Sequence, residues 1–244
     1  EKGFIYNLRK HVFVFDLATG EAKPLTQGEF DVGKAAWSHD GKRIAYLAAM
    51  EDRRPFLYDL FILDVATGRS AQLTKHNLEI DTLAWSPDDK ALAIVADDLP
   101  RGFASHLHLW RIDVAGGKME RLDDLDRNLS NSLNCDVRMG GVNAEPKWVG
   151  DRIVFPVAEG GSVHLYALRV ADRKMDLVVG GDRSVEAFQV RGDAIVFTAM
   201  ERSRPPELYV SQGGVRALSP FNAKPQEDLE LLVPERLTFR ASDG

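Results

Sequence analysis

The sequence repeats one ten-residue stretch with variations. Residues 37–46 read WSHDGKRIAY, and residues 85–94 read WSPDDKALAI. Shorter copies read WVGDRIVF at residues 148–155 and VRGDAIVF at residues 190–197. Successive copies start 48, 63 and 42 residues apart, and in each copy a polar turn precedes a run of strand-forming residues. A repeat near the length of four short strands is typical of a β-propeller, in which each repeat forms one blade.

The repeats predict an all-β fold, a β-propeller of four-stranded blades with four complete repeats and a partial one. The expected units are a partial blade at 1–30, blades at 31–75, 79–122, 145–180 and 184–219, an insertion loop at 123–144, and a linker leading into a following domain at 220–244. An open arc of this kind would leave an apolar blade face at each end. We therefore expect another segment or another chain to cover these faces.

The turn inside the repeat keeps its chemistry when its residues change. Gly41 supplies the positive φ that the first copy needs, and in the second copy this position is Asp89, one of the few other residues that tolerate it. We expect Trp37, Trp85 and Trp148 to pack between blades. The repeat therefore builds a scaffold and is not expected to carry catalysis.

Composition excludes several classes of function. The formal net charge of −6 and the pI near 5.6 argue against a nucleic-acid partner, which would require a basic stripe. No apolar run approaches the roughly 20 residues of a membrane-spanning helix, so no membrane partner is expected. The single Cys135 cannot form an internal disulfide, which fits a reducing compartment, and we expect it to be inert.

The insertion at 123–144 is the first place to look for specificity. It is polar and long for a connection in a compact domain, and it is either a functional loop or a mobile surface loop. Arg138 and Glu145 flank its end, where a propeller presents side chains toward its channel, so they are the candidate substrate-binding residues. The alternative, which we favour, is that these two residues form a salt bridge that anchors the loop.

For the other polar groups that could bind a ligand, we favour a structural role. His106 and His108 alternate on one strand face as metal ligands might, but no third ligand is evident nearby, so no metal is expected. The acidic pairs at 97–98 and 123–124 could bind a peptide amino group, but we expect solvated turn acids. The Arg-Gly-Asp tripeptide at 191–193 occupies the turn of the repeat and needs no adhesion function.

The C-terminal segment carries a more specific resemblance. Pro234 and Glu235, an alternating strand expected at 237–239, and the terminal Ser-Asp-Gly at 242–244 look like the junction between the propeller and the α/β-hydrolase domain of a prolyl oligopeptidase family serine peptidase. The WSPDG-type repeats and the Leu-Thr endings of the units are similar to those of the acylaminoacyl peptidase branch. The repeats also resemble TolB-like propellers, whereas the Trp-Asp strand ending of a WD-repeat scaffold is absent.

The resemblance implies a hydrolase, a serine peptidase in which a seven-bladed propeller gates proteolysis and selects short peptides. Its partners would be a peptide substrate and a C-terminal α/β-hydrolase domain, with a homo-oligomer as a further expectation, no cofactor and a cytoplasmic location. No Gly-x-Ser-x-Gly pattern occurs in the sequence, so this chain is expected to hold no catalytic residue. The alternative is a TolB-like propeller that acts as a protein interaction module, with a periplasmic location.

Overall fold

The first two repeated turns fold as hairpins because one serine organises each of them. In the first turn, Ser38 Oγ donates to Asp40 Oδ1 at 2.6 Å and accepts the backbone N–H of Arg43 at 3.0 Å. In the second, Ser86 Oγ donates to Asp88 Oδ1 at 2.7 Å and accepts the backbone N–H of Ala91 at 2.9 Å. Short polar side chains that bond the nearby backbone favour turns over longer regular structure. The two copies therefore start strand pairs in the same way.

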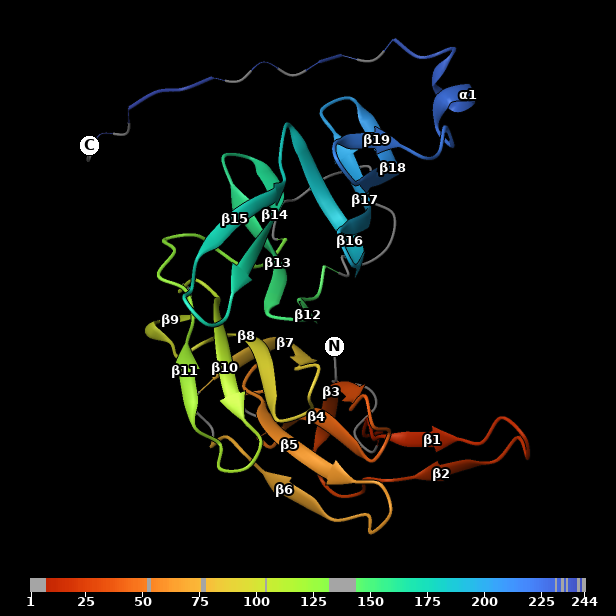
Figure 1. Cartoon of the computed structure of the whole chain (residues 1–244), viewed down its shortest axis with the longest axis vertical. Coiled ribbons are helices and arrows are strands. Elements are labelled where there is room, and N and C mark those ends of the chain that lie inside the picture. Colours follow the sequence, from red (N-terminus) through yellow and green to blue (C-terminus); the bar gives the residue numbers. More distant parts are fainter. Residues whose placement is uncertain are drawn as a thin grey trace.

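The computed structural model of the chain describes residues 8–51, 54–75, 78–103, 105–131, 144–230, 232–233, 235, 237–240 and 242. These residues form an arc of antiparallel sheets, ordered along the chain from the N-terminal end to the C-terminal end (Figure 1). In each complete unit the first strand lies toward the inside of the arc, and β3, β7, β12 and β16 are these inner strands. The fold is the propeller arc that the repeats predict.

The sheets are built from strands that are consecutive, or nearly so, in the sequence. A two-stranded sheet holds β1 (Phe13–Phe15) and β2 (Ala22–Pro24), and a four-stranded sheet holds β3 (Asp31–Trp37), β4 (Arg43–Ala49), β5 (Asp59–Asp64) and β6 (Ser70–Gln72). The next four-stranded sheet holds β7 (Glu79–Trp85), β8 (Ala91–Asp97), β10 (His108–Asp113) and β11 (Met119–Arg121). The short strand β9 (Pro100–Phe103) lies between β8 and β10 in the sequence and was not expected.

The last two units share one sheet. Their strands are β12 (Lys147–Val149), β13 (Arg152–Glu159), β14 (Ser162–Arg169), β15 (Met175–Val179), β16 (Arg183–Arg191), β17 (Ala194–Glu201), β18 (Arg204–Ser211) and β19 (Val215–Ala217). A single parallel bridge between Val163 and Ser184 joins the two sets of four. A four-residue helix, α1 (Ala223–Gln226), follows, and no helix in the described ranges is long and apolar enough to cross a membrane.

The core consists of layers between adjacent units. Strand β4 shows the arrangement, because Ala45 and Leu47 pack against the sheet of β7 and β8, whereas Ile44, Tyr46 and Ala48 pack toward Val12 beside β1. Strands β8 and β13 divide their residues between two layers in the same way. A strand covered on both faces is apolar throughout and does not alternate, as its sequence shows.

In four units, the end of the fourth strand is fastened to the third strand by a repeated pair of bonds. The backbone N–H of Leu73 bonds to Leu60 O at 2.8 Å, and the next residue, Thr74, accepts the N–H of Leu60 through Oγ1 at 2.8 Å. The same pair of contacts recurs with Thr26, Asp123 and Ser219 as the side-chain acceptors. This is the physical role of the Leu-Thr endings in the sequence.

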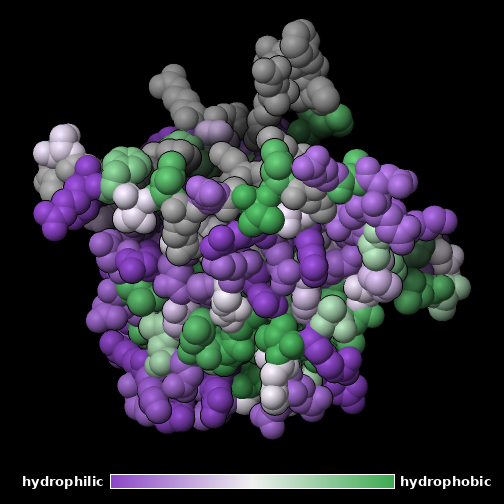
Figure 2. All heavy atoms as spheres, turned by 90° about the horizontal axis from the view of Figure 1, so that it is seen from above, coloured by the Kyte–Doolittle hydropathy of each residue, from purple (hydrophilic) through white to green (hydrophobic). Residues whose placement is uncertain are grey.

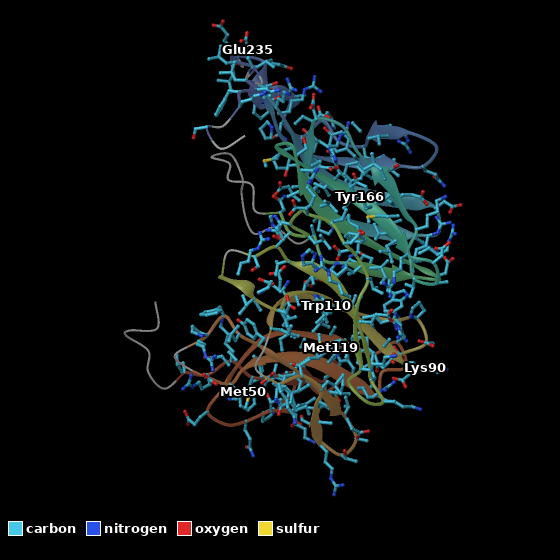
Figure 3. All side chains as sticks on the ribbon, turned by 90° about the vertical axis from the view of Figure 1, so that its left-hand side faces the viewer. Met50, Lys90, Trp110, Met119, Tyr166 and Glu235 are labelled. Carbon is cyan, nitrogen blue, oxygen red and sulfur yellow. The ribbon has the colours of Figure 1, made fainter. Side chains whose placement is uncertain are left out.

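The antiparallel order gives the arc two different faces. One face carries the repeated turns and the hairpins that join third and fourth strands; the other carries the β4–β5, β8–β10, β13–β14 and β17–β18 connections. Figure 3 shows Met50, in the β4–β5 connection, and Lys90, in a repeated turn, on opposite sides of the molecule. Because each unit has four strands, the chain leaves a unit on the face from which it entered. The insertion therefore starts on the Met50 face.

The structure corrects one predicted tryptophan contact and one predicted strand. Trp85 is buried and donates from Nε1 to Ala36 O at 3.0 Å, and Trp148 packs against the layer between the second and third units. Trp37, however, is 49% exposed, because the sheet on its outer side has only the short strands β1 and β2 within the described residues. The segment expected to form a strand at 237–239 is not in a strand, and its side chains are exposed. A strand requires a hydrogen-bonding partner, and the described residues give it none.

Apolar surface remains at the ends of the arc. Phe13 and Phe15 of β1 are exposed at one end, and Val196 and Val215 are partly exposed on the last sheet. Figure 2, a view from above Figure 1, shows apolar atoms gathered between hydrophilic regions. These exposures agree with the expectation that an open arc leaves apolar blade faces at its ends.

Candidate functional site

Glu145 lies where inner strands of different units approach one another. It precedes β12, and its carboxylate is 3.3 Å from Lys34 Nζ on β3 and 3.6 Å from Lys147 Nζ on β12. Strands β3 and β12 both approach β7, the inner strand of the unit between them. Glu145 therefore links the first complete unit to the third across the inside of the arc.

The candidate residues of the sequence are not brought together within the described residues. Arg138 lies outside the described residues, as does Cys135. Glu145 forms ion pairs with two lysines that were not considered, and its side chain is 31% exposed and so accessible to a ligand. The substrate-binding role of Arg138 and Glu145 stays a prediction.

The acidic pair at 97–98 is not a pair of solvated turn acids. Asp98 is exposed, but Asp97 ends β8 and is only 1% exposed, with Oδ1 accepting the backbone N–H of Leu99 at 2.9 Å. Asp97 pairs across the strands with Glu79, whose pKa is raised by burial and by the charges of Asp97 and Asp81. Asp97 is buried because it is the last residue of a strand that is buried along its whole length.

In the second acidic pair, too, the expectation of solvated turn acids is wrong for Asp123, whereas Asp124 is exposed, and Asp123 and the histidines have structural partners. Asp123 is buried, and its carboxylate accepts the backbone N–H of Leu109 at 2.6 Å and lies 3.0 Å from His108 Nδ1. His106 lies on the surface, with Nε2 3.7 Å from Asp126 Oδ1. Within the described ranges, no three His, Cys, Asp or Glu side chains are grouped so that they could hold a metal ion.

The first part of the insertion is fixed between units. Leu129 is buried in the layer between the second and third units, and Asn128 O accepts the backbone N–H of Ala158 at 2.9 Å. Asn131 Nδ2 then donates to Val185 O at 2.9 Å and lies 3.0 Å from Ser184 Oγ at the start of β16. The insertion up to residue 131 is therefore part of the packed structure on the Met50 face.

A polar hollow of about 590 Å³ lies on this same face, near the insertion. Its lining includes Arg127 from the insertion, Glu159 and His164 from the β13–β14 hairpin, and Asp182 from the connection to β16. Both signs of charge are therefore present in one concave site. Such a site suits a ligand with polar groups of both kinds, as a peptide has.

The hollow has an ordered network of side chains. Glu159 Oε1 accepts from Tyr166 OH at 2.7 Å and lies 2.7 Å from His164 Nδ1, while His164 Nε2 lies 2.9 Å from Gly181 O. The imidazole therefore bridges the carboxylate of Glu159 and the backbone carbonyl of Gly181 in the connection between β15 and β16.

The network raises the pKa of Tyr166 and lowers the pKa of Glu159. Burial, with the hydrogen bond and charge of Glu159, raises the pKa of Tyr166 to about 12. Burial alone would raise the pKa of Glu159, but hydrogen bonds from Tyr166 and His164 outweigh it and hold that pKa below its ordinary value. Figure 3 shows Tyr166 within the third unit, among its strands. The tyrosine is therefore a proton donor and the glutamate an anion at neutral pH.

Sequence reasoning missed this network. His164 and Tyr166 are two residues apart in a strand and so share one face, and Glu159 lies just before the preceding turn. That spacing was the available signal. This signal is weak because Asp182 and Arg127 are distant from these residues in the sequence and line the hollow only in the folded chain.

Comparisons with known proteins show the fold. No family model and no curated protein sequence matches the chain. A puromycin hydrolase structure is similar over 82% of this chain, with a TM-score of 0.65 and 19% identity, and the acylaminoacyl peptidase of Pyrococcus horikoshii over 90%, with 0.58 and 17%. TolB of Acinetobacter baumannii is similar over 85%, with a TM-score of 0.60 and 18% identity.

The coverage of these proteins is partial. The matched chain spans 30% of the puromycin hydrolase, 43% of the acylaminoacyl peptidase and 48% of TolB. The likeness matches the resemblance expected from the repeats, to peptidase propellers and to TolB. At these identities it is a likeness of fold, and the activities named belong to those proteins.

Proposed function

We propose that this chain is the non-catalytic propeller part of a serine peptidase of the prolyl oligopeptidase family. In this role it gates access to a catalytic α/β-hydrolase domain and selects short peptides for it. The observation that carries the proposal is the shared face: the first part of the insertion up to residue 131, the 590 Å³ hollow and the point where the chain leaves its last sheet at Leu218 are all on one side of the arc.

The fold supports this arrangement through its strand count. A four-stranded unit returns the chain to the face from which it entered, so a domain that continues from Leu218 would sit beside the hollow and the insertion. The likeness to puromycin hydrolase and acylaminoacyl peptidase covers less than half of those proteins, which leaves room in them for such a domain. A substrate would then meet the propeller face before the catalytic groups.

The charges on this face favour peptide recognition. The hollow holds an anionic Glu159 beside Arg127 and His164, and Glu145 lies between two lysines on the inner strands. A peptide carries an ammonium, a carboxylate and amide groups, each of which these side chains can bond.

The first experiment tests for the peptidase. The intact gene product is treated with a fluorophosphonate probe, which reacts with activated serines, and the labelled residue is mapped by mass spectrometry. Labelling of a serine that follows residue 244 supports the proposal. If the native polypeptide ends at Gly244, or the intact product shows no labelling, the peptidase proposal fails.

The second experiment tests selection by the propeller. In the intact enzyme, kcat/KM is measured for chromogenic peptides of two to four residues and for a peptide of about 30 residues, with Arg138→Ala, Glu145→Gln and the control Glu21→Gln. Loss of activity on short peptides in the first two variants, with the exposed Glu21 variant unchanged, supports their substrate-binding role. Equal activity in all variants contradicts that role.

The alternative function is a TolB-like module that binds protein partners. The observation in its favour is the similarity to TolB over 85% of this chain. It predicts that the intact product lacks a hydrolase domain and lies in the periplasm. The peptidase proposal places it in the cytoplasm, and cell fractionation separates the two. The homo-oligomer is tested by the mass of the intact product in solution.

A further inference from the structure

The start of strand β16 carries an arginine whose hydrogen-bonding capacity is not used. Arg183 Nε and Nη1 are buried and have no hydrogen-bond acceptor among the described residues. Its remaining nitrogen, Nη2, lies 3.6 Å from Glu201 Oε1, which is an ion pair and longer than a hydrogen bond. Buried donors are almost always bonded, so two such groups on one guanidinium require an explanation.

The guanidinium is held in place by contacts that do not consume these donors. Its Cζ lies 5.4 Å from the ring centroid of Tyr209, which is a cation–π contact. Gly181, with φ +98°, lies beside the guanidinium, and a Cβ at this position would be in ordinary van der Waals contact with Arg183 Nε at 3.5 Å. The positive φ is the feature that favours glycine here. The arginine is thus positioned before any ligand arrives.

Arg183 lines a small pocket with an excess of positive charge. The pocket, of about 370 Å³, lies at the β17–β18 turn and is lined by Asp182, Arg183, Glu201, Arg202, Ser203 and Arg204. Arg202 Nη2 is 2.9 Å from Asp182 Oδ2, and Arg204 Nη1 is 3.9 Å from Glu201 Oε2. Three arginines against two acids leave one net positive charge.

From these observations we infer that this pocket binds a carboxylate group of a peptide, either its C-terminus or an acidic side chain. A guanidinium edge matches the two oxygens of a carboxylate, and shielding from solvent strengthens charge-assisted bonds. The single excess charge suits a carboxylate better than a phosphate dianion. Asp182 lines both this pocket and the 590 Å³ hollow, so a peptide could extend from one to the other.

This inference rests on the proposed function in one respect, namely that peptides reach the face that carries the β17–β18 turn. The pocket would then hold the acidic end of a peptide while Glu159 and the hollow face its other polar groups. It adds a preference that the gating role alone does not include. Peptides with a free carboxylate at this position would be selected over their amides.

The test measures binding to the intact chain without any hydrolysis. Tri-alanine, its C-terminal amide and inorganic phosphate are titrated separately, and affinity is followed by calorimetry and by amide chemical shifts. We expect the free acid to bind at least 10-fold more tightly than the amide, with shifts at Gly181, Asp182 and Ser203. Equal binding of acid and amide, no binding of the acid, or tighter binding of phosphate would overturn the inference.

Variants locate the site. R183Q should weaken tri-alanine binding at least 10-fold, whereas R183K, which keeps the charge but loses the planar fork, should weaken it less. R216Q is the matched control, because Arg216 lies exposed on β19 away from the pocket, and it should bind as the wild type does. Wild-type affinity in R183Q contradicts the inference. If R183Q does not fold, the chemical-shift map of the wild-type chain decides.

The outcome is independent of the peptidase test. If fluorophosphonate labelling fails but tri-alanine binds through Arg183, the carboxylate site stands and only the peptidase proposal falls. If labelling succeeds and tri-alanine does not bind, the peptidase proposal stands and the carboxylate site falls.

Discussion

The carboxylate of Asp89 fastens one unit of the arc to the turn of the preceding unit, at His39. Asp89 Oδ1 accepts the backbone N–H of His39 at 2.9 Å and lies 2.8 Å from His39 Nδ1, and Oδ2 accepts the backbone N–H of Asp40 at 2.9 Å. Asp89 itself has φ +55° and is buried. The residue that replaces glycine in the second turn thus makes a contact that glycine could not.

Removing this side chain should destabilise the fold. Asp89→Gly keeps the freedom to adopt positive φ but leaves two backbone N–H groups without their acceptors, so we expect a loss of about 1 to 3 kcal/mol in the free energy of unfolding. Urea denaturation measures it. The control Asp193→Gly, in the exposed turn of the last unit, should change stability by less than about 0.5 kcal/mol. Equal effects of the two substitutions would refute the role of the contact.

The same contact predicts an acid dependence of stability. Burial by itself would raise the pKa of Asp89, but hydrogen bonds from His39 and Asp40 outweigh burial and hold the pKa below its ordinary value. A lowered pKa contributes stability that is present above the unfolded pKa of about 3.9 and is lost as pH falls through the folded pKa. Thermal melts of wild type and Asp89→Asn should therefore converge as pH is lowered below about 4.

Ile153 tests whether the layers between sheets form the core. It is fully buried on β13 and faces Val95 and Leu109 of the preceding unit in one cluster. Ile153→Ala should cost about 2 to 5 kcal/mol through lost burial and a cavity. Leu177→Ala, on the exposed side of β15, is the control and should cost less than about 1 kcal/mol. A neutral Ile153→Ala would count against the packing described.

A substitution of Thr74 tests the side-chain contact that joins the end of the fourth strand to the third strand. Thr74→Val keeps the shape of the side chain but removes the acceptor of the Leu60 N–H, so we expect a loss of about 1 to 3 kcal/mol. Amide hydrogen exchange is the sharper measurement, because the Leu60 amide should exchange faster by more than the global change explains. The Ile153 amide, on β13 in another unit, should follow the global change alone. Equal acceleration at both amides would refute the role of Thr74.

Tyr166 should resist ionisation. Its pKa of about 12 predicts that the phenol stays protonated at pH 11, when an exposed tyrosine is mostly ionised. Absorbance titration of wild type minus Tyr166→Phe reports this residue alone. Since the unfolded tyrosine ionises near pH 10, the contribution of Tyr166 to stability is present below pH 10 and is lost between pH 10 and 12. A difference titration centred near pH 10 would contradict the network with Glu159.

The fold was largely predictable because the turns and the second strands are local signals. The positive φ of Asp89 and the apolar β4 follow from a few neighbouring residues. The prediction for Trp37 is wrong because the burial of this side chain depends on the sheet beside it. The prediction for Asp97 is wrong because this residue ends a strand and does not lie in the turn that follows. Leu129 gave no periodic signal, although it is buried. The buried donors of Arg183 depend on Tyr209 and Gly181, which no local pattern connects with it.

The division of β4, β8 and β13 between two layers also bears on how such a chain grows and folds. No four-stranded unit has a core of its own, since the second strands β4, β8 and β13 each lie between two cores, so the smallest cooperative element is a pair of neighbouring units. Unfolding should therefore spread from an end of the arc by nearest-neighbour coupling, as in other repeat proteins. When one four-stranded unit is duplicated in evolution, both faces of the new unit can pack against neighbouring units. When only part of a unit is duplicated, neither face has a matching surface to pack against.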